Sequence, residues 1–361
     1  MGAEAVAAML PFLTERFGNP SGAHAVARDA RLALDEAREV VAFHLGCEPG
    51  DVVFTGGGTE ADNLAIAGAH ARRPGRVVCS AVEHHAVLHA TQALGGTVVP
   101  VDRRGVIDLD ALADTLDADV TVVSVMLANN EVGTVQPLAE VAALVAAKAP
   151  QAVLHTDAVQ AFPWLDVAVL AADAHLVAVS AHKFGGPKGV GALAVRSGAA
   201  VAPIIHGGGQ ERDRRSGTHN VAGIVAMAAA MEATSTKRAE TVEHVGDLRD
   251  RLADGLVSAV PGAVETGDRT TKIAGNCHIR FDGIESEALL VLLDEAGLCA
   301  SAGSACASGA IEPSHVLRAM GLTVTEAVSS VRFSLGATST EVDVDLALKL
   351  VPDAVAQLRA R

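Results

Sequence analysis

The sequence predicts an α/β protein with a mostly parallel central sheet and a smaller α+β domain towards the C-terminal end. Between residues 50 and 200, short apolar runs rich in valine alternate with helical patterns. Near-continuous apolar runs of this kind are typical of parallel strands that are buried on both faces. We expect strands at residues 52–54, 76–80, 120–126, 153–155 and 175–179.

The pattern changes in the last third of the chain. Apolar side chains recur at helical spacing across residues 238–260, which predicts a long amphipathic helix. Strand-like segments follow at 276–281 and 331–335, and a helix is expected at residues 8–17. We therefore expect a large domain over residues 1–240 and a small one over residues 241–361.

Composition narrows the class of protein. The formal net charge is −15, from 28 Lys and Arg against 43 Asp and Glu, and such a field disfavours a direct nucleic-acid partner. The five cysteines contain no Cys-x-x-Cys pair and no Cys/His ligand spacing, so neither a disulfide framework nor a metal site is indicated. No apolar run reaches the ~18 residues of a membrane span, and the first residues show no leader pattern. We expect a cytoplasmic protein that does not enter a membrane.

Polar residues follow each expected strand of the sheet. Ligands of open parallel sheets bind beyond the carboxyl ends of the strands, so these residues should meet at one edge. They are Gly56-Gly57-Gly58-Thr59, Glu83-His84-His85, Asn129-Asn130-Glu131, Asp157 with Gln160, and Ser180-Ala181-His182-Lys183. A core whose buried polar groups are all hydrogen-bonded does not need polar residues after every strand.

Each of these signals is weak alone. Three glycines before a helix are more often a plain tight turn, an Asp past a strand is often a helix N-cap, and a lone lysine is usually solvated. Together, however, they match the needs of pyridoxal phosphate: a lysine for the aldehyde, a helix N-terminus with hydroxyls for the phosphate, a carboxylate for the pyridine nitrogen, and a planar group for the ring. The lysine is Lys183, and the carboxylate is Asp157. The groups for the phosphate are Gly58 and Thr59 with Ser180 and His182, and the planar group is His84. We expect Lys183 to be desolvated in a cleft, as suits its chemistry with an aldehyde.

Longer strings occur in order along nearly the whole chain. They are FTGGGTEADN at 54–63, NNEVG at 129–133, HTDAVQ at 155–160, SAHK at 180–183, GGGQER at 207–212, RSGT at 215–218, SACAS at 304–308 and VRFS at 331–334. Together they resemble the cysteine desulfurases, which belong to the aminotransferase class V group of fold-type I pyridoxal-phosphate enzymes. The string around Cys306 is similar to the NifS/IscS-like group. The resemblance implies conversion of L-cysteine to L-alanine, with the sulfur held as a persulfide on an enzyme cysteine.

The resemblance also implies roles for the residues around the cofactor ring. Lys183 resembles the lysine that binds the cofactor covalently and moves the substrate proton. Asp157 resembles the partner of the pyridinium nitrogen, and His84 resembles the imidazole that stacks on the ring and acts as acid or base. Gln160 looks like the donor to the ring hydroxyl, with Asn130 beside it.

Further matches concern the phosphate and the substrate. Gly58, Thr59, Ser180 and His182 resemble the residues that hold the phosphate. Thr218 is similar to a threonine that reaches the phosphate of the neighbouring subunit, which implies a homodimer. Arg332 resembles the clamp for the substrate carboxylate, in keeping with the bidentate geometry of a guanidinium. Asn19 and Asn130 match positions near the substrate.

Cys306 is the residue that separates desulfurization from other pyridoxal-phosphate chemistry. The small residues around it predict a mobile loop, whose thiol can reach the substrate sulfur and then carry it outward. Cys299 follows Leu298 in an apolar stretch and is instead expected to be buried and inert.

Several points stay open. Family members usually begin with a strand that carries an Asp-x-Ala-Ala-Thr-like string, and this sequence starts at Met1-Gly2 without it. Another class V enzyme, such as a selenocysteine lyase or an aminotransferase, and a catalytically inactive homologue that binds partners are the alternatives. The sulfur acceptor is also open, between iron–sulfur cluster assembly and tRNA thiolation.

Overall fold

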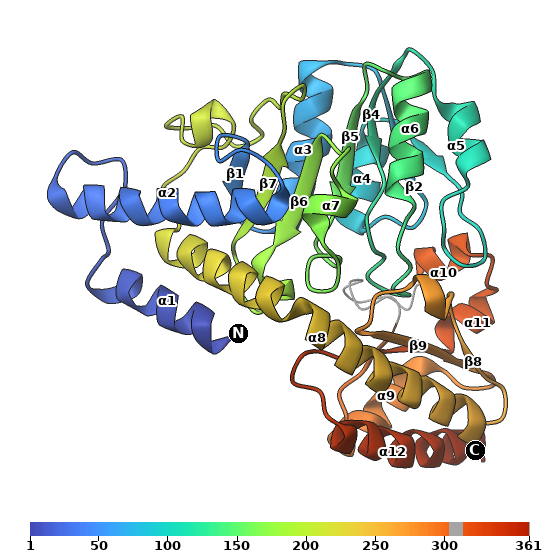
Figure 1. Cartoon of the computed structure of the whole chain (residues 1–361). Helices are drawn as coiled ribbons and strands as arrows, with labels where there is room; N and C mark the ends of the chain where they lie inside the picture. Colours follow the sequence, from blue (N-terminus) through green and yellow to red (C-terminus); the bar gives the residue numbers. More distant parts are fainter. Residues whose placement is uncertain (303–312, 361) are drawn as a thin grey trace. The chain divides into compact units, whose positions relative to one another are not determined.

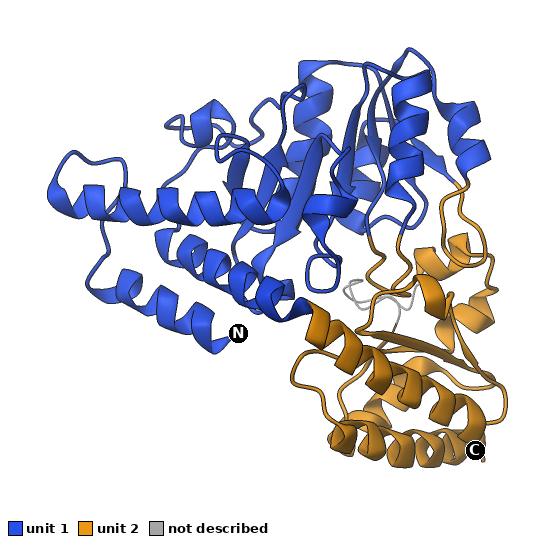
Figure 2. Cartoon of the chain, in the orientation of Figure 1, with its two compact units in different colours: residues 1–99, 109–127, 136–238 blue, residues 100–108, 128–135, 239–361 orange. Residues whose placement is uncertain are grey.

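The computed structural model describes residues 1–302 and 313–360. The chain divides into two compact units, which Figure 2 shows in different colours. Unit 1 comprises Met1–Val99, Leu109–Leu127 and Gln136–Arg238, and unit 2 comprises Pro100–Asp108, Ala128–Val135 and Ala239–Arg361. Two short segments in the first half of the sequence therefore belong to unit 2.

Unit 1 is built on a seven-stranded sheet with the strand order β1-β7-β6-β5-β4-β2-β3 (Figure 1). The strands are β1 (Val52–Thr55), β2 (Arg76–Ser80), β3 (Thr97–Val99), β4 (Val120–Ser124), β5 (Val153–Asp157), β6 (Leu176–Ser180) and β7 (Gly191–Val195). β7 is antiparallel to both of its neighbours, and the other pairs are parallel. Every residue of β1, β4, β6 and β7 is buried, as expected for strands covered on both faces.

Helices surround this sheet. They are α1 (Ala3–Thr14), α2 (Ala25–Leu45), α3 (Gly58–Arg72), α4 (His85–Ala93), α5 (Leu109–Thr115), α6 (Leu138–Lys148), α7 (Val167–Leu170) and the first part of α8 (Val221–Ala259), which continues into unit 2. α3 packs against the sheet, where its Leu64 and Ile66 share one buried apolar cluster with Val122 and Leu176 of the strands. α3 is thereby held with its N-terminus at the carboxyl ends of the strands.

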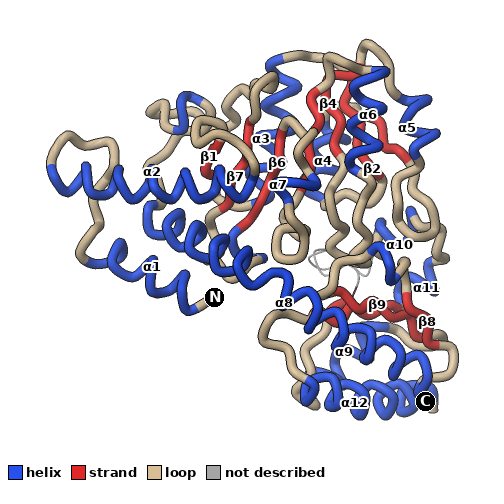
Figure 3. The backbone as a smooth tube through the Cα atoms, in the orientation of Figure 1, coloured by secondary structure: helices blue, strands red, loops and turns tan. Residues whose placement is uncertain are grey.

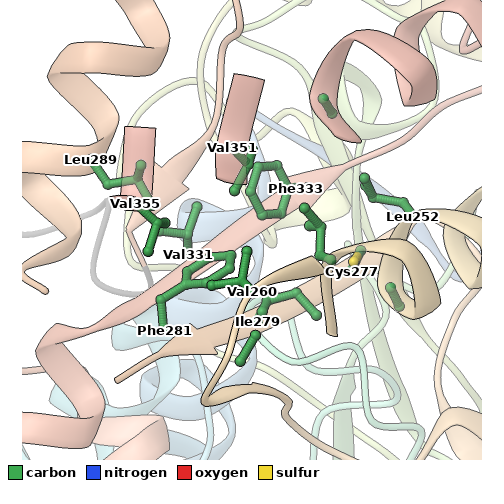
Figure 4. Close-up of a cluster of buried hydrophobic side chains, with 14 of the residues drawn as sticks. Leu252, Val260, Cys277, Ile279, Phe281, Leu289, Val331, Phe333, Val351 and Val355 are labelled. Atoms are coloured by element: carbon green, nitrogen blue, oxygen red, sulfur yellow. The ribbon is translucent and has the colours of Figure 1, made fainter. Parts of the chain in front are cut away.

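Unit 2 contains a four-stranded antiparallel sheet with the order β10-β11-β9-β8. Its strands are β8 (Ala263–Glu265), β9 (Asn276–Phe281), β10 (Ser301–Ala302) and β11 (Ser330–Ser334), and its further helices are α9 (Ser286–Glu295), α10 (His315–Ala319), α11 (Val324–Val328) and α12 (Glu341–Arg359). Figure 4 shows its apolar core, in which Phe281 and Val331 of the sheet lie among side chains such as Leu289 of α9 and Val355 of α12. This core makes unit 2 a folded body with its own interior.

The secondary structure confirms the five strands expected in unit 1 and the two expected in unit 2 (Figure 3). The expected helices were placed too late in the sequence, because α1 begins at Ala3 and α8 already at Val221. β3 and β7 of unit 1 and β8 and β10 of unit 2 were missed. β7 begins with Gly191 and holds two alanines, which have low strand propensity. Glycine is needed there, because a Cβ at Gly191 would lie 2.6 Å from the Val179 carbonyl oxygen and 2.8 Å from the Gly57 carbonyl carbon.

Within the described part of the chain, no helix combines the length and apolarity needed to cross a membrane.

Candidate active site

Polar side chains gather where the parallel strands of unit 1 end. Asp157 is the last residue of β5 and Ser180 the last residue of β6, and these two strands are paired neighbours in the sheet. Glu83 and His84 follow β2 on the same sheet. Because the carboxyl ends of parallel strands share one edge, the sequence prediction of a polar edge is confirmed for these residues.

A turn of three glycines leads from β1 into α3 and forms an open helix N-terminus. The N-cap is Gly57, whose φ of 146° favours glycine and which offers no capping side chain. A Cβ at Gly58 would lie 2.8 Å from Val159 Cγ2 and 3.4 Å from Ser180 Cβ, so the turn packs closely on the end of β6. Ser180 Oγ in turn lies 2.9 Å from His182 Nδ1. Backbone N–H groups, a hydroxyl and an imidazole thus meet at a helix N-terminus, which suits a phosphate.

Asp157 is a buried carboxylate at the centre of this edge. The Val159 N–H donates to Asp157 Oδ1 over 2.8 Å. Burial raises the pKa of Asp157, whereas the charge of His84, the Val159 hydrogen bond and the charge of Lys183 act in the opposite direction. The site therefore holds an acid whose ionised form is supported by nearby donors and cations.

His84 lies beside Asp157. It is the N-cap of α4, where its Nδ1 accepts a hydrogen bond from the Ala86 N–H over 3.2 Å. A ring nitrogen of His84 and a carboxylate oxygen of each of Asp62 and Asp157 all lie within 4.8 Å of one another. The imidazole is half-buried, and the cap fixes its position at the site.

Lys183 lies in a short 3-10 helix, Ala181–Lys183, that follows β6 directly. The turn after it is closed by N–H groups of Phe184 and Gly186, which both donate to the Ala181 carbonyl oxygen. Lys183 is exposed among the described residues, so the desolvation expected for it is not observed there. Its charge nevertheless acts on Asp157.

The remaining expected residues of unit 1 lie at varied positions. Gln160 is half-buried three residues after Asp157, and Thr59 is exposed in the first turn of α3. Thr218 is exposed and lines a small hollow of about 100 Å³ together with Thr55 and Gly56. Asn19 is exposed, and its Oδ1 accepts from the Ser21 N–H over 3.0 Å.

Two expected substrate residues lie together in unit 2. Arg332 Nη1 donates to the Asn130 carbonyl oxygen over 2.9 Å. Arg332 is also the β11 partner of His278 in β9. Within the described residues, the Nε of Arg332 has no hydrogen-bond partner.

Glu131, next to Asn130, was expected among the polar residues that follow the strands but was given no role in the site. Ser314 Oγ donates to its carboxyl over 2.5 Å, and Asn276 Nδ2 donates to its carbonyl oxygen over 2.9 Å. Burial raises the pKa of Glu131 to about 7, against the hydrogen bond of Ser314 and the charge of Arg332. Its position as the charged residue of the NNEVG segment at 129–133 could have pointed to a role in the site.

Cys306 lies outside the described residues, as do the other residues of its string. The expectation for Cys299 is wrong: this cysteine is exposed, because α9 ends at Glu295 and the apolar stretch before it belongs to that helix. Cys79 and Cys277 are buried instead, and burial raises the pKa of both thiols to about 12. These two thiols stay protonated and poorly nucleophilic at neutral pH.

Sequence reasoning also missed Asp62 and His155. Asp62 lies in the second turn of α3 and His155 lies in β5, and both are fully buried. The signal for Asp62 was a carboxyl two positions before the apolar Leu64-Ala65-Ile66 stretch of a helix that covers the sheet. His155 sits two residues before Asp157 in the same strand, and this spacing places the two side chains on one face.

Comparison with known proteins agrees with this architecture. The aminotransferase class-V profile matches residues 2–347. A cysteine desulfurase IscS from Methanosarcina thermophila is 43% identical, and the match covers 99% of this chain and 89% of that protein. A cysteine desulfurase NifS from Azotobacter vinelandii is 44% identical, with 99% and 90% covered. A solved NifS-like protein is 36% identical with a TM-score of 0.92, and 99% of this chain and 97% of that chain are covered.

The architecture is that of the fold-type I α/β enzymes, as the sequence predicted. The chain belongs to the aminotransferase class-V family and, within it, to the cysteine desulfurases.

Proposed function

We propose that the chain is a pyridoxal-phosphate-dependent cysteine desulfurase that converts L-cysteine to L-alanine and takes the sulfur onto Cys306. The observation that carries the proposal is the edge of the unit 1 sheet, where an open helix N-terminus, a buried carboxylate and a lysine occur on neighbouring elements. The identity with cysteine desulfurases along 99% of the chain supports the same activity.

The phosphate and the ring of the cofactor each have fitting groups. Pyridoxal phosphate, when bound, supplies a ring that withdraws electrons from the substrate Cα. The N-terminus of α3 with Ser180 and His182 suits the phosphate, because these groups offer N–H, hydroxyl and imidazole donors side by side. Asp157 would hold a proton at the pyridine nitrogen, and His84 beside it would offer a flat imidazole to the ring.

Other side chains complete this proposed set. The amine of Lys183 would hold the aldehyde of the cofactor and would move the proton of the substrate Cα. Gln160 would donate to the ring hydroxyl, and Thr59 would add a hydroxyl for the phosphate. Gln160 follows β5, the strand that ends in Asp157. Thr59 lies in the first turn of α3, the helix whose N-terminus is proposed to bind the phosphate.

Substrate binding is assigned to residues of unit 2. Arg332 binds the carboxylate of L-cysteine through paired N–H groups, and its hydrogen bond to the Asn130 carbonyl oxygen orients the guanidinium. Asn130 thereby acts through Arg332 as well as through its own side chain. Asn19 of unit 1 contributes an exposed amide.

The sulfur step is a transfer between two sulfur atoms. The thiolate of Cys306 attacks the substrate sulfur, so that an S–S bond forms while the Cβ–S bond of the substrate breaks. The electron pair of the broken bond passes to the carbon side, and the Cβ takes up a proton equivalent to the one that the substrate thiol gave up. The products are L-alanine and a persulfide on Cys306, with no other oxidant or reductant required.

The proposal extends to partners. Thr218 is assigned to the phosphate site of a second copy of the chain, which makes the working enzyme a homodimer. The persulfide then passes to a sulfur-acceptor protein of iron–sulfur cluster assembly or tRNA thiolation in the cytoplasm. The net charge of −15 disfavours direct contact with nucleic acid.

The test is product analysis of the purified protein with L-cysteine and a thiol reductant. We expect a yellow protein that releases alanine and sulfide in equal amounts. Cys306→Ser should keep the visible absorbance and release no sulfide, whereas Cys299→Ser, a matched change seven positions earlier, should release sulfide like the parent. Full sulfide release by Cys306→Ser would remove Cys306 from the mechanism. A keto acid in place of alanine would indicate an aminotransferase, and a colourless protein without turnover would indicate an inactive homologue.

A further inference from the structure

A group of buried acids and imidazoles surrounds Asp157 in unit 1, and the proposed function does not use all of it. Asp62 of α3 is 1% exposed and His155 of β5 is 0% exposed. His155 Nε2 lies 3.5 Å from Asp62 Oδ1, and His155 Nδ1 lies 2.8 Å from Ser124 Oγ at the end of β4. Figure 1 shows α3 lying along the sheet to which β4 and β5 belong.

The two aspartates are too close to be ionised together. One carboxylate oxygen of Asp62 and one of Asp157 lie within 4.8 Å of each other and of a His84 ring nitrogen. Both residues are shielded from water. Two like charges at such a distance in a buried site repel strongly, and one of the two carboxyls keeps its proton.

The surroundings of the two carboxyls differ. Asp157 accepts the Val159 N–H over 2.8 Å, and the charges of His84 and Lys183 favour its ionised form. Asp62 Oδ1 has no hydrogen-bond partner among the described residues. These contacts place the negative charge on Asp157.

The groups that face Asp62 come from several elements. From β5 come His155 and Asp157, and from the segment between β2 and α4 come Glu83 and His84. Burial, the charge of Asp157 and then that of Glu83 raise the pKa of Asp62 well above its ordinary value. Burial also lowers the pKa of His155 to about 3, so this ring is neutral and does not compensate a carboxylate.

We infer that Asp62 holds the proton of this cluster at neutral pH and is a positioning residue that keeps Asp157 as the ionised carboxylate. The inference rests on the proposed function for its consequence, because an ionised Asp157 is what a pyridinium nitrogen requires. Asp62 thus connects the two elements of the proposed site. It belongs to α3, whose N-terminus would bind the phosphate, and it acts on Asp157 of β5, whose carboxylate would face the ring.

The direct test is infrared spectroscopy of the full chain at neutral pH, with aspartate carboxyl groups labelled with ¹³C. We expect a carbonyl band of a protonated aspartic acid, shifted by the label. Asp62→Asn should lose this band, because the amide replaces the protonated acid with a neutral group of the same shape. Glu83→Gln is the matched control and should keep the band, because it changes a glutamate that the aspartate label does not report.

Two results would overturn the inference. One is a labelled parent protein without a protonated-acid band, which needs no variant to fold. The other is a band that survives Asp62→Asn and disappears in Asp157→Asn. Because the label reports on aspartate with or without bound pyridoxal phosphate, failure of the proposed cofactor would leave the test intact.

A second measurement follows the visible absorbance of the bound cofactor against pH. Asp62→Asn exchanges one neutral group for another, so the midpoint of the titration should stay where it is in the parent. If Asp62 were ionised, its removal would delete a neighbouring charge and shift the midpoint by about one unit or more. Metal analysis gives a last check: a divalent cation bound one to one and lost in Asp62→Asn would contradict a proton at this place.

Discussion

Asp157 and Glu131 show at the scale of single residues how burial and partners set the charge of an acid. Asp157 is buried next to a backbone N–H, His84 and Lys183, which oppose the rise in its pKa. Glu131 is also buried, but its ionised form is favoured only by the hydroxyl of Ser314 and the charge of Arg332. Its pKa lies at about 7. Glu211 is the opposite case, since His219, Arg38 and the Phe54 N–H donate to it and hold its pKa at about 2.

The shifted pKa of Glu131 predicts a pH dependence of stability. Its pKa rises from 4.5 when unfolded to about 7 when folded, so the folded chain binds more protons between these values. The stabilisation is complete below about pH 4.5 and is lost as the pH rises towards 7. The loss amounts to about 3.5 kcal/mol at most, because one pKa unit corresponds to about 1.4 kcal/mol.

Glu131→Gln should remove this dependence, because the amide does not titrate. Urea unfolding of parent and variant at several pH values between 5 and 7.5 measures it, through the difference between their midpoints. We expect the midpoint of the parent to fall with pH relative to that of the variant. Parallel curves for the two proteins would contradict the raised pKa.

At the scale of elements, α3 organises the site. Its N-terminus is left open by Gly57, its first turn packs on the end of β6 through Gly58, and its second turn carries Asp62 to the neighbourhood of His155. The apolar face of the same helix is fixed on the sheet by Leu64. One element thereby sets both the proposed phosphate position and the proton balance around Asp157.

Gly58→Ala tests the role of this close packing. The new Cβ would lie 2.8 Å from Val159 Cγ2, so the turn or the Val159 side chain must move. We expect the affinity for pyridoxal phosphate to fall by about tenfold or more, because such overpacking costs about 1–3 kcal/mol. Equilibrium titration of the cofactor-free chain measures this change.

Gly246→Ala is the matched control for that experiment. Gly246 lies inside α8, and a Cβ there meets nothing within 4 Å. The same substitution should leave cofactor affinity unchanged and stabilise the helix slightly. Equal affinities for Gly58→Ala and the parent would show that the turn does not shape the phosphate site.

At the scale of the whole molecule, the strands that carry the site could be predicted from the sequence. β1, β2, β4, β5 and β6 are buried on both faces, so each appears as an apolar run, and the polar residue after each run marks its end. β7 could not be found in this way, because its alanines have low strand propensity and its first residue, Gly191, is required by close packing against the Gly57 turn. Packing of this kind has no local signature.

The same limit applies to the environment of single residues. The sequence names Lys183 and Cys299 but does not tell how much of either side chain the neighbouring elements cover, and both are more exposed than expected. It also does not reveal the approach of Asp62 to His155, because these residues are 93 positions apart and meet only when α3 packs on β5. The types of residue and their order in the sequence predict which residues are candidates for the site. The fold then determines whether each of them is protonated and how exposed it is.

In the proposed enzyme, Lys183 is the residue that binds pyridoxal phosphate. The chain has six lysines, and Lys188 lies only five positions further along, which makes it the natural control. Reduction of the purified protein with borohydride fixes the cofactor on the lysine that holds it, and peptide mass spectrometry then locates the label. The account predicts the label on Lys183, present in Lys188→Ala and absent from Lys183→Ala. A label on any other lysine, or none on a protein that still turns over L-cysteine, would contradict it.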